Sequence, residues 1–494
     1  MIWDVVVVGA GNAAMSAALS AREAGASVLV LERAPEEARG GNSAYTGGAF
    51  RVAYDGADDI ASIADVSEHE LATSDFGSYP EAQFLNDLAE MSGYRADPEL
   101  LYRLVGESRD ALLWLREQGV RFLPSYGRQS FRVDGRAVFW GGLTIESAGG
   151  GQGLMDALFV RAEERGIEIR YRHNIVRLLQ DRGSVSGVVA RTPDGEREIA
   201  ARSVVLAAGG FHANAEWRTR YLGPGWEAAK VRGSRYNTGG GIRAAIDAGA
   251  MSHGNWSGCH SVFFDARAEP FGVPGVLNQQ KNYFGLGIVV NTHGERFFDE
   301  GSDFRNYIYS LMGARILKQP GGYGWQIFDA EAVALLPDEY RTPRAAKLQA
   351  DTIDALIARL QGVDGPQLKA TIEAYNAACD PAVTFNPAIK DGKATRGLAT
   401  SKSNWANPIV TPPFTAFEVT CGITCTFAGV AIDDAASVRG EDGLPMPGLY
   451  ACGEMVGGLY YERYPGGAGL TSGTVFGRVA GTAAAAHAAT FAPI

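Results

Sequence analysis

The chain has 494 residues, of which 46% are hydrophobic and 20% charged, and this composition argues against a disordered or fibrous protein. Lys and Arg number 45 against 56 Asp and Glu, and the net charge of −11 disfavours a nucleic-acid partner. An anionic small substrate stays possible, because a few arginines set the field inside a pocket. The 63 glycines, about 13% of the chain against a usual 7%, predict tight turns and close approaches of the backbone to a ligand.

The N-terminus is apolar, but no signal peptide is expected. Asp4 precedes the apolar run and the first basic residue is Arg22. No stretch reaches about 18 uncharged apolar residues, so no transmembrane segment is expected either. Five cysteines form no CxxC, and Cys421 and Cys425 are predicted to be reduced thiols. These features predict a soluble, cytoplasmic protein.

Residues 4–33 carry the pattern of one βαβ unit. Val5–Val8 is a β-branched run typical of a strand buried on both faces. A glycine turn leads into an Ala/Leu-rich helix that ends at Glu23, and a second strand, Val28–Leu31, ends at Glu32. Such a unit favours a parallel sheet covered by helices.

The later elements follow in a recognisable order. A Gly-rich segment at 40–50 precedes a polar, helical pattern over 56–120. A second α/β stretch, from about 149, contains a strand meander that returns to a buried strand at Val204–Ala208. The chain ends in a helix of small residues, GTVFGRVAGTAAAAHAAT.

The change of pattern between these stretches indicates the domain organisation. From 256 to 412 the sequence is mixed and punctuated by prolines, whereas strands and glycine turns return from 413. We predict an α/β fold in which a discontinuous Rossmann-like dinucleotide-binding domain, residues 1–255 and 413–494, is interrupted by an inserted α+β capping domain, residues 256–412.

The segment Gly9-Ala10-Gly11-Asn12-Ala13-Ala14 is the strongest chemical motif. Its glycines allow the backbone to approach a pyrophosphate, and the helix start supplies N–H donors and the positive end of the dipole. Glu32 follows about 20 residues later, where a carboxylate binds a ribose hydroxyl pair. The motif serves NAD and FAD alike. A near-match at Gly239–Ala244 lacks a preceding buried strand and is interpreted as a helix start, so we expect one dinucleotide.

Four segments resemble the fumarate reductase/succinate dehydrogenase flavoprotein superfamily. They are GAGNAAMSAALSAREAG with VLVLER, GGNSAYTGG, GIVVNTHGERF, and GLYACGEMVGGLYYERYPGGAGLTSGTVFGRVAG. The resemblance spans nearly the whole chain, is strongest to the FAD-dependent tricarballylate dehydrogenase branch, and extends near the N-terminus to precorrin-oxidising flavoproteins. It implies FAD as cofactor, and thus a Rossmann-like FAD-binding domain with a cap.

The motif and the resemblance together indicate the cofactor-binding residues. The resemblance implies that the 41–48 segment passes the pyrophosphate and isoalloxazine, that the backbone of Val176 contacts adenine, and that N–H groups of Gly467–Leu470 face the pyrimidine edge. No His occurs at 42–45, where succinate dehydrogenase attaches FAD, so the FAD is expected to be non-covalent. The full predicted set is Gly9, Gly11, Asn12, Ala13, Glu32, Arg33, Gly41, Asn42, Ser43, Gly47, Gly48, Val176, Ala208, Gly209, Gly210, Gly453, Glu454, Gly469 and Leu470.

The resemblance also implies catalytic residues. Arg305, shortly after GERF, matches the family's proton donor or acceptor; because Arg has an intrinsic pKa above about 12, this role needs positive neighbours and a dry pocket. His260, four residues after Trp256, matches the His that binds a substrate carboxylate. An ion-pairing surface Arg and a structural His are the alternatives.

Three departures from the family pattern argue against succinate or fumarate as substrate. Thr424 and Cys425 stand where fumarate reductases carry a His, and Lys281 and Phe284 stand at the proton-relay positions. The third departure is Tyr464, which replaces the second carboxylate-binding Arg.

Tyr464 lies in YPGGAG, a turn that also resembles ketosteroid 1-dehydrogenases, where a Tyr assists abstraction of a Cα hydrogen. Arg463 is adjacent and is a candidate for holding an anionic group. The alternative is that Tyr460, Tyr461 and Tyr464 are core aromatics.

The predicted function is an FAD-dependent oxidoreductase that adds or removes H₂ across a C–C bond next to a carboxylate or carbonyl, with Arg305, His260, Tyr464 and Arg463 as catalytic residues. A tricarballylate-type polycarboxylate dehydrogenase is the first expectation. The alternatives are an enone reductase or ketone desaturase and a non-redox flavin-binding accessory protein. No metal, iron–sulfur or haem ligand spacing is present, so a separate electron acceptor or donor is expected.

Overall fold

β1 (Trp3–Val8) lies at the centre of an eight-stranded sheet because its four consecutive valines are buried on both faces. The computed structural model of this chain describes residues 2–273 and 279–491. Five strands of this sheet are parallel, in the order β20 (Pro445–Ala451), β12 (Gly195–Leu206), β1, β2 (Val28–Leu31) and β9 (Glu168–Arg170). The predicted βαβ unit is thereby confirmed.

The remaining strands extend this sheet with antiparallel pairs. The meander expected from the sequence is formed by β10 (Asn174–Asp181), β11 (Ser184–Thr192) and the first half of β12, while β19 (Ser437–Arg439) pairs with β20. α10 (Gly240–Asp247), capped by Gly239, packs on β10, so the second glycine motif is a helix start.

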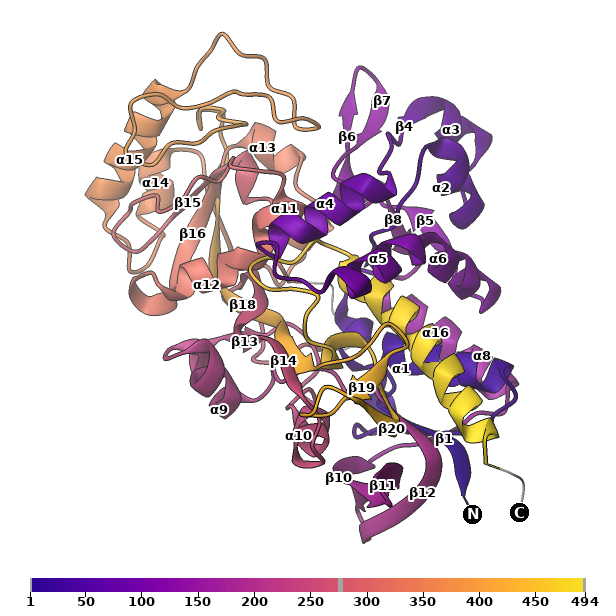
Figure 1. Ribbon diagram of the computed structural model, residues 1–494. Coiled ribbons are helices and arrows are strands. Elements are labelled where there is room, and N and C mark those ends of the chain that lie inside the picture. Colours follow the sequence, from indigo (N-terminus) through magenta and orange to yellow (C-terminus); the bar gives the residue numbers. More distant parts are fainter. Residues whose placement is uncertain (1, 274–278, 492–494) are drawn as a thin grey trace.

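Two helices from opposite ends of the chain lie side by side on the parallel strands (Figure 1). They are α1 (Asn12–Glu23) and α16 (Ala468–Ala489), and α8 (Gly150–Glu164) packs beside α1. A Cβ on Gly477 would lie 2.6 Å from the carbonyl oxygen of Ala13, and one on Gly481 would lie 2.1 Å from that of Ala17. Both positions must be glycine for α16 to approach α1 this closely.

A second, six-stranded sheet builds the cap. β18 (Phe414–Val430) pairs with β13 (Lys230–Val231), β14 (Ser252–Asp265), β16 (Tyr323–Phe328) and β17 (Lys347–Ala350), and β15 (Ile288–Val290) pairs with β16. The helices of this region are α11 (Arg305–Ile308), α12 (Met312–Leu317), α13 (Ala330–Ala334), α14 (Ile353–Ile357) and α15 (Gly365–Ala378). Position 256 therefore falls inside a strand of this sheet, and β18 begins just after 412. A short α9 (Ala215–Trp217) precedes β13.

A third region faces the cap across the upper part of Figure 1. Its helices confirm the helical pattern of 56–120: α2 (Ala57–Ile63), α3 (Glu68–Thr73), α4 (Glu81–Met91), α5 (Pro98–Gly106) and α6 (Ser108–Glu117), followed by the short α7 (Tyr126–Gln129). Two small sheets hold them, β3 (Ala49–Phe50) with β8 (Ile145–Ser147) and β5 (Phe122–Pro124), and β4 (Ser74–Asp75) with β7 (Arg136–Phe139) and β6 (Ser130–Val133).

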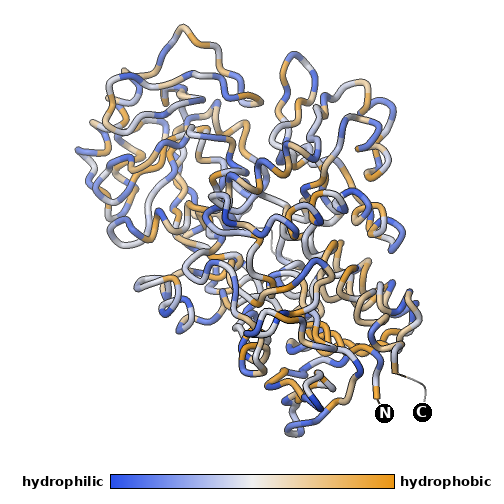
Figure 2. The backbone as a smooth tube through the Cα atoms, in the orientation of Figure 1, coloured by the Kyte–Doolittle hydropathy of each residue, from blue (hydrophilic) through white to orange (hydrophobic). Residues whose placement is uncertain are grey.

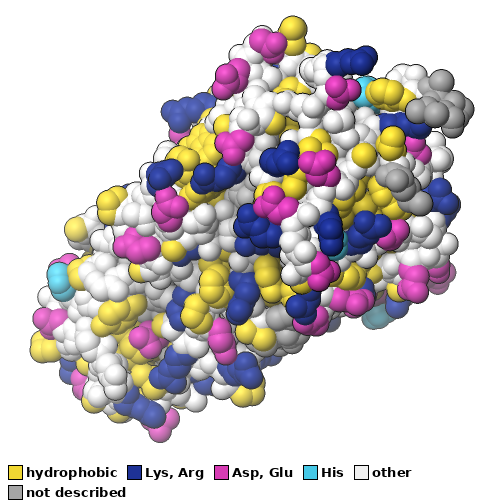
Figure 3. Space-filling model, turned by 90° about the horizontal axis from the view of Figure 1, so that it is seen from below, with side chains coloured by type: hydrophobic (Ala, Val, Ile, Leu, Met, Phe, Trp, Pro, Cys, Tyr) yellow, Lys and Arg dark blue, Asp and Glu magenta, His cyan; other side chains and the backbone are white. Residues whose placement is uncertain are grey.

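The hydropathy and charge patterns agree with this architecture. Hydrophobic colour follows the strands near the N-terminus in Figure 2 and is interrupted by hydrophilic residues along the outer helices. On the face drawn in Figure 3, Lys and Arg are intermixed with Asp and Glu, without a broad area of one sign. No helix among the described residues has the length and apolarity to cross a membrane.

Substituting Gly481 tests the close packing of α1 and α16. Gly481→Ala forces the added Cβ against the carbonyl of Ala17 and should destabilise the protein by about 1–3 kcal/mol. Gly106→Ala is the matched control, since Gly106 ends α5 with no atom within 4 Å of the added carbon. It should be neutral or stabilising by up to about 1 kcal/mol. Denaturant unfolding measures the free energy of unfolding of both variants. Equal values for Gly481→Ala and Gly106→Ala would contradict the close packing of α1 and α16.

Candidate active site

One large cavity opens where the first sheet, the second sheet and the third region meet. It measures about 1920 Å³, with the solvent at its mouth included. Its lining begins at the carboxyl ends of β1 and β2, passes the 41–47 segment and ends at Arg305 and His260. Ligands of open parallel sheets bind at this edge.

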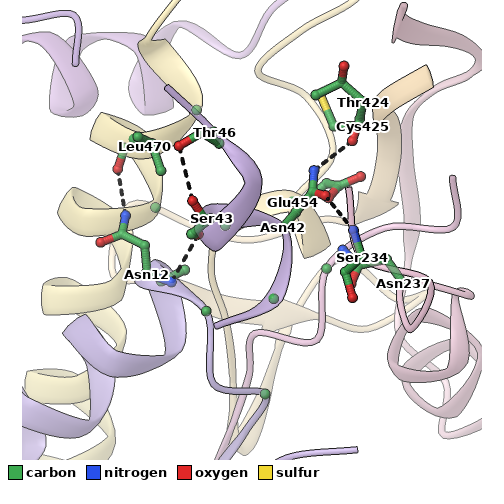
Figure 4. Close-up of a pocket in the computed structure, with 18 of the residues that line it drawn as sticks. Asn12, Asn42, Ser43, Thr46, Ser234, Asn237, Thr424, Cys425, Glu454 and Leu470 are labelled. Atoms are coloured by element: carbon green, nitrogen blue, oxygen red, sulfur yellow. Dashed lines mark hydrogen bonds between the residues drawn. The ribbon is translucent and has the colours of Figure 1, made fainter. Parts of the chain in front are cut away.

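The turn after β1 forms one wall of the cavity. Gly9 has a φ of +107°, and a Cβ there would lie 2.4 Å from the carbonyl oxygen of Ala207. The 40–43 segment packs on this turn, because a Cβ on Gly11 would meet the carbonyl of Gly40 at 3.6 Å. The Asn12 N–H at the start of α1 donates to Ser43 Oγ at 3.1 Å (Figure 4). The Asn12 N–H is thus hydrogen-bonded within the protein. The backbone of the glycine turn that precedes it carries no side chain and remains open to an anion.

A buried carboxylate marks one end of the cavity. Glu32 is 7% exposed, its Oε1 accepts the Ala34 N–H at 2.7 Å, and burial raises its pKa. Arg33 lies beside it and donates through Nη1 to the Tyr236 carbonyl at 3.1 Å and to the Thr238 hydroxyl. This arrangement suits a ribose with its flanking base.

Asn42 joins the middle of the cavity to the second sheet (Figure 4). Its Nδ2 donates to the Thr424 carbonyl at 2.7 Å, and its Oδ1 accepts the Ser234 N–H at 3.1 Å. Asn42 is therefore fixed in place by two distant parts of the chain.

Glu454 is an ionised, partly buried carboxylate. Burial acts to raise its pKa, but His212 and N–H donors, including that of Thr426 at 2.8 Å, hold the pKa below its ordinary value. The His212 Nδ1 lies 3.1 Å from Glu454 Oε1. A hydrogen-bond acceptor is thus presented to the cavity.

The N-terminus of α16 reaches the same cavity. Asn12 Nδ2 donates to the Leu470 carbonyl at 2.9 Å, which fixes α16 to the start of α1 (Figure 4). Gly467, the N-cap, has a φ of +81°, and Gly469 donates its N–H to the Tyr464 hydroxyl at 2.7 Å. The positive end of this long helix therefore faces the cavity and favours negative charge there.

Arg305 lies at the far end between two aromatic rings. Its guanidinium carbon is 4.5 Å from the centre of the Tyr283 ring and 5.3 Å from that of Trp140. Its Nη2 donates to the Arg128 carbonyl at 2.5 Å, while its buried Nε has no hydrogen-bond partner among the described residues. The aromatic faces stabilise the cation and fix its orientation.

His260 lies in the same chamber as a neutral imidazole. Its ring centre is 4.7 Å from those of Tyr309 and Tyr464, and its buried Nδ1 lacks a hydrogen-bond partner among the described residues. Burial, with the nearby Arg232 guanidinium, holds the pKa of His260 well below its usual range. Burial likewise raises the pKa of Tyr464, and that of Tyr309 to about 12, so both phenols are protonated at neutral pH.

The chamber holds two arginines that the sequence did not single out. Arg128 of α7 and Arg232, next to β13, line the cavity together with Arg305. Arg232 donates to Thr424 Oγ1 at 3.1 Å. The far end of the cavity is therefore rich in positive charge, although the chain as a whole is acidic.

Most of the predicted residues line this cavity. They are Gly9, Gly11, Asn12, Ala13, Glu32, Arg33, Gly41, Asn42, Ser43, Gly47, Ala208, Gly209, Gly453, Glu454, Gly469, Leu470, His260, Arg305 and Tyr464.

Four predicted residues do not line the cavity. Arg463 lies toward α4, where its N–H donates to the Met91 carbonyl at 2.9 Å and its Nη2 reaches the Glu90 carbonyl at 3.5 Å. Gly48 packs against Ser147 and Gly150, Gly210 supports Glu454, and Val176 is replaced in the lining by Ile175. Arg463 is therefore held against α4, outside the lining of this cavity.

The residues that sequence reasoning missed come from segments without a motif. Arg128 and Gln129 belong to the short α7, which Ser125 precedes. Tyr236 and Thr238 follow β13 in a loop. Lys281 and Phe284, at the family's relay positions, are buried away from the cavity; Lys281 Nζ is 3.5 Å from Asp265 Oδ2. The five cysteines are free, and Cys425 lines the cavity. No cluster of metal-binding side chains occurs in the described part of the chain.

Comparisons with known proteins identify the class. Residues 4–470 match the FAD binding domain family. The chain is 29% identical to a probable fumarate reductase of Shewanella frigidimarina, over 98% of this chain and 75% of the relative. It is 30% identical to the 4-oxocyclohexanecarboxylate 2-dehydrogenase of Sinomonas cyclohexanicum, over 99% and 93% of the two chains. The structure of a flavocytochrome c3 fumarate reductase superposes with a TM-score of 0.73 at 28% identity, over 98% of this chain and 78% of that one.

The chain therefore belongs to the FAD binding domain family and has the α/β fold of fumarate reductase-like flavoproteins. It is an FAD-dependent oxidoreductase of this superfamily. The cavity fits the cofactor, because the bare backbone of Gly9 and Gly11 lines it beside the start of α1 and Glu32 lies buried where the ribose would bind.

The phosphate cradle is tested by substituting Gly9. Gly9→Ala places a Cβ against the Ala207 carbonyl and should cost most of the flavin occupancy. Gly25→Ala is the matched control, because Gly25 has a similar φ of +89° but no atom within 4 Å of the added carbon. Absorbance of the purified variants measures occupancy; equal occupancy would contradict the assigned role.

The neutral state of His260 makes stability depend on pH. Below about pH 6.5 the unfolded chain binds a proton that the folded protein excludes. The contribution of His260 is therefore complete above that pH and is lost as the pH falls. Thermal unfolding at pH 8 and pH 5.5 should show a smaller acid loss for His260→Gln than for the wild type or the exposed control His69→Gln. Identical losses would refute the neutral, buried state.

Proposed function

We propose that this protein adds or removes H₂ across a C–C bond next to a carboxylate or carbonyl. The observation that carries this proposal is the convergence of Arg305, His260 and Tyr464 at one end of a cavity whose other end has a phosphate cradle and a buried Glu. FAD, when bound, supplies the hydride chemistry. The chain's own residues bind the substrate, orient it and exchange its proton.

Arg305 is the proposed proton donor or acceptor at the substrate's α-carbon. Two aromatic rings and the Arg128 carbonyl hold its guanidinium in one orientation, and this supports proton transfer along a fixed direction. Arg128 and Arg232 line the chamber together with Arg305. Arg305 regains its proton when the reaction runs the other way.

An anionic substrate is proposed because the chamber is cationic. His260 and the chamber arginines would bind a carboxylate, and a polycarboxylate of the tricarballylate type is the first candidate. A ring ketone is the second candidate. It is favoured by the protonated phenols of Tyr309 and Tyr464, which would donate to a carbonyl oxygen, and by the name of the Sinomonas relative, which joins a ketone to a carboxylate.

Two further features belong to this proposal. We infer that the FAD is non-covalent, since 42–45 contain no His, and that a separate protein or small molecule exchanges electrons with it. A flavin-binding accessory protein without redox turnover is the remaining alternative, and the cationic chamber argues against it.

The proposal is tested by anaerobic titration of the yellow protein with tricarballylate, succinate, 4-oxocyclohexanecarboxylate and neutral cyclic ketones. Bleaching of the flavin by one acid is expected for a dehydrogenase. Rapid reoxidation of the dithionite-reduced protein by an unsaturated acid or enone is expected for a reductase. No bleaching of the oxidised flavin and no reoxidation of the reduced flavin by any of these compounds would reject the proposed reaction in favour of the accessory role.

Substituting Arg305 tests its proposed role. Arg305→Met removes the exchangeable protons while keeping an apolar side chain between the rings, so turnover should fall by about 10²–10⁴-fold with flavin still bound. Arg463→Met is the control and should retain turnover within about threefold, because Arg463 lies outside the cavity. Stopped-flow reduction measures both variants; near-normal turnover of Arg305→Met would reject the assignment.

A further inference from the structure

Arg128 reaches the chamber from the third region, opposite the cap. It lies in α7, a single helical turn, and lines the cavity with Gly47 and Gln129. The guanidinium rests directly on Gly47, since a Cβ at that position would lie 1.6 Å from Arg128 Nη1. A charged group is therefore placed beside the segment that borders the centre of the cavity.

One carboxylate contacts this guanidinium, and a second lies in the same neighbourhood. Glu339, whose side chain is buried in the cap, lies with Oε1 3.2 Å from Arg128 Nε. A second acid, Glu146, accepts from Ser125 Oγ at 2.6 Å, and burial raises its pKa. Glu339 pairs with Nε of Arg128, while Nη1 extends over Gly47. The ion pair therefore fixes the side chain and leaves Nη1 directed toward the cavity.

The backbone of Arg128 also orients the proposed proton-exchanging residue. Its carbonyl oxygen accepts from Arg305 Nη2 and from the Tyr283 hydroxyl, each at 2.5 Å. Arg128 and Arg305 are therefore coupled in position. An anion bound by Arg128 would therefore be held at a fixed distance from Arg305.

We propose that Arg128 binds a carboxylate of the substrate, and that α7 thereby supplies the second anion-binding residue opposite His260. This inference rests on the proposed function and deepens it. A guanidinium binds a carboxylate through two parallel N–H donors, which positions as well as attracts it. The substrate accordingly carries a carboxylate at the end next to Gly47, and a neutral analogue binds weakly there.

The alternative role for Arg128 is a structural link between α7 and the cap through Glu339. A purely structural role predicts that removing Arg128 affects anionic and neutral ligands alike. A binding role predicts a selective loss for the anion. The two roles are separated by comparing an acid with its primary amide, which has the same shape without the charge.

The experiment uses the flavin-loaded protein and three variants, Arg128→Met, Arg128→Gln and Arg128→Lys. Tricarballylate, succinate and 4-oxocyclohexanecarboxylate are titrated into the oxidised wild type by calorimetry, and the tightest acid is then compared with its primary amide. Calorimetry measures binding apart from turnover. The KM for the same acid is measured in parallel, and thermal unfolding reports any structural damage.

We expect Arg128→Met to weaken binding of the acid by about 10–100-fold and binding of the amide by less than about threefold. Arg128→Lys should restore part of the affinity for the acid. An equal effect on acid and amide, or no effect on either, overturns the proposal. If Arg128→Met loses the flavin, Arg128→Gln gives the same comparison; loss of flavin in both variants makes the residue structural and also overturns it. A wild type that binds no acid but turns over a neutral cyclic ketone overturns the role of Arg128 and leaves the proposed function in place, whereas a wild type that turns over neither an acid nor a ketone rejects the proposed function itself.

Discussion

The close contact of α16 with α1 is the constraint on which the site depends. Gly473, Gly477 and Gly481 recur every fourth residue along one side of α16, and a Cβ on either of the last two would enter the backbone of α1. Because of this contact, the C-terminal helix presents its positive end to the same cavity as the phosphate-binding turn at the opposite end of the chain. The hydrogen bond from Asn12 to the Leu470 carbonyl fixes the register. The cap sheet, whose strand β18 carries Thr424 and Cys425, covers a site whose two other walls are positioned by this contact.

The charge inside the cavity is opposite in sign to the net charge of the chain. The chain is acidic, yet three arginines and the positive end of α16 face the far part of the cavity. His260 adds a neutral donor or acceptor because burial and Arg232 keep it deprotonated. The far part of the cavity therefore gathers positive charge in a chain that is acidic as a whole, and the protonated phenols of Tyr309 and Tyr464 add hydrogen-bond donors to the same space.

The sequence predicted the parts of the fold that have local causes. The valine run and the glycine turn fix a buried strand and the turn after it through neighbouring residues, and Glu32 follows the next strand at the edge of the cavity. Their contacts with phosphate and ribose stay predictions. Arg128 and Arg232 could not be found in this way, because they lie in a short helix and a loop without a motif, and only tertiary packing brings them to the chamber. Arg463 illustrates the opposite case: one residue's difference from Tyr464 turns it toward α4 instead of the cavity. The cap sheet also departs from its predicted limits, because β13 and β18 lie outside them and β14 crosses position 256. The reason is the same, since a sheet recruits partners that are distant in sequence.

The measurement that tests the central claim most directly is a crystal structure of the flavin-loaded protein with the acid that reduces it, or with that acid's oxidation product. The account predicts the isoalloxazine between the 41–47 segment and the start of α16, and the ligand beyond it with one carboxylate at Arg128 and the reacting carbon next to Arg305. A ligand bound outside this chamber, or one whose reacting carbon lies away from Arg305, would contradict the account.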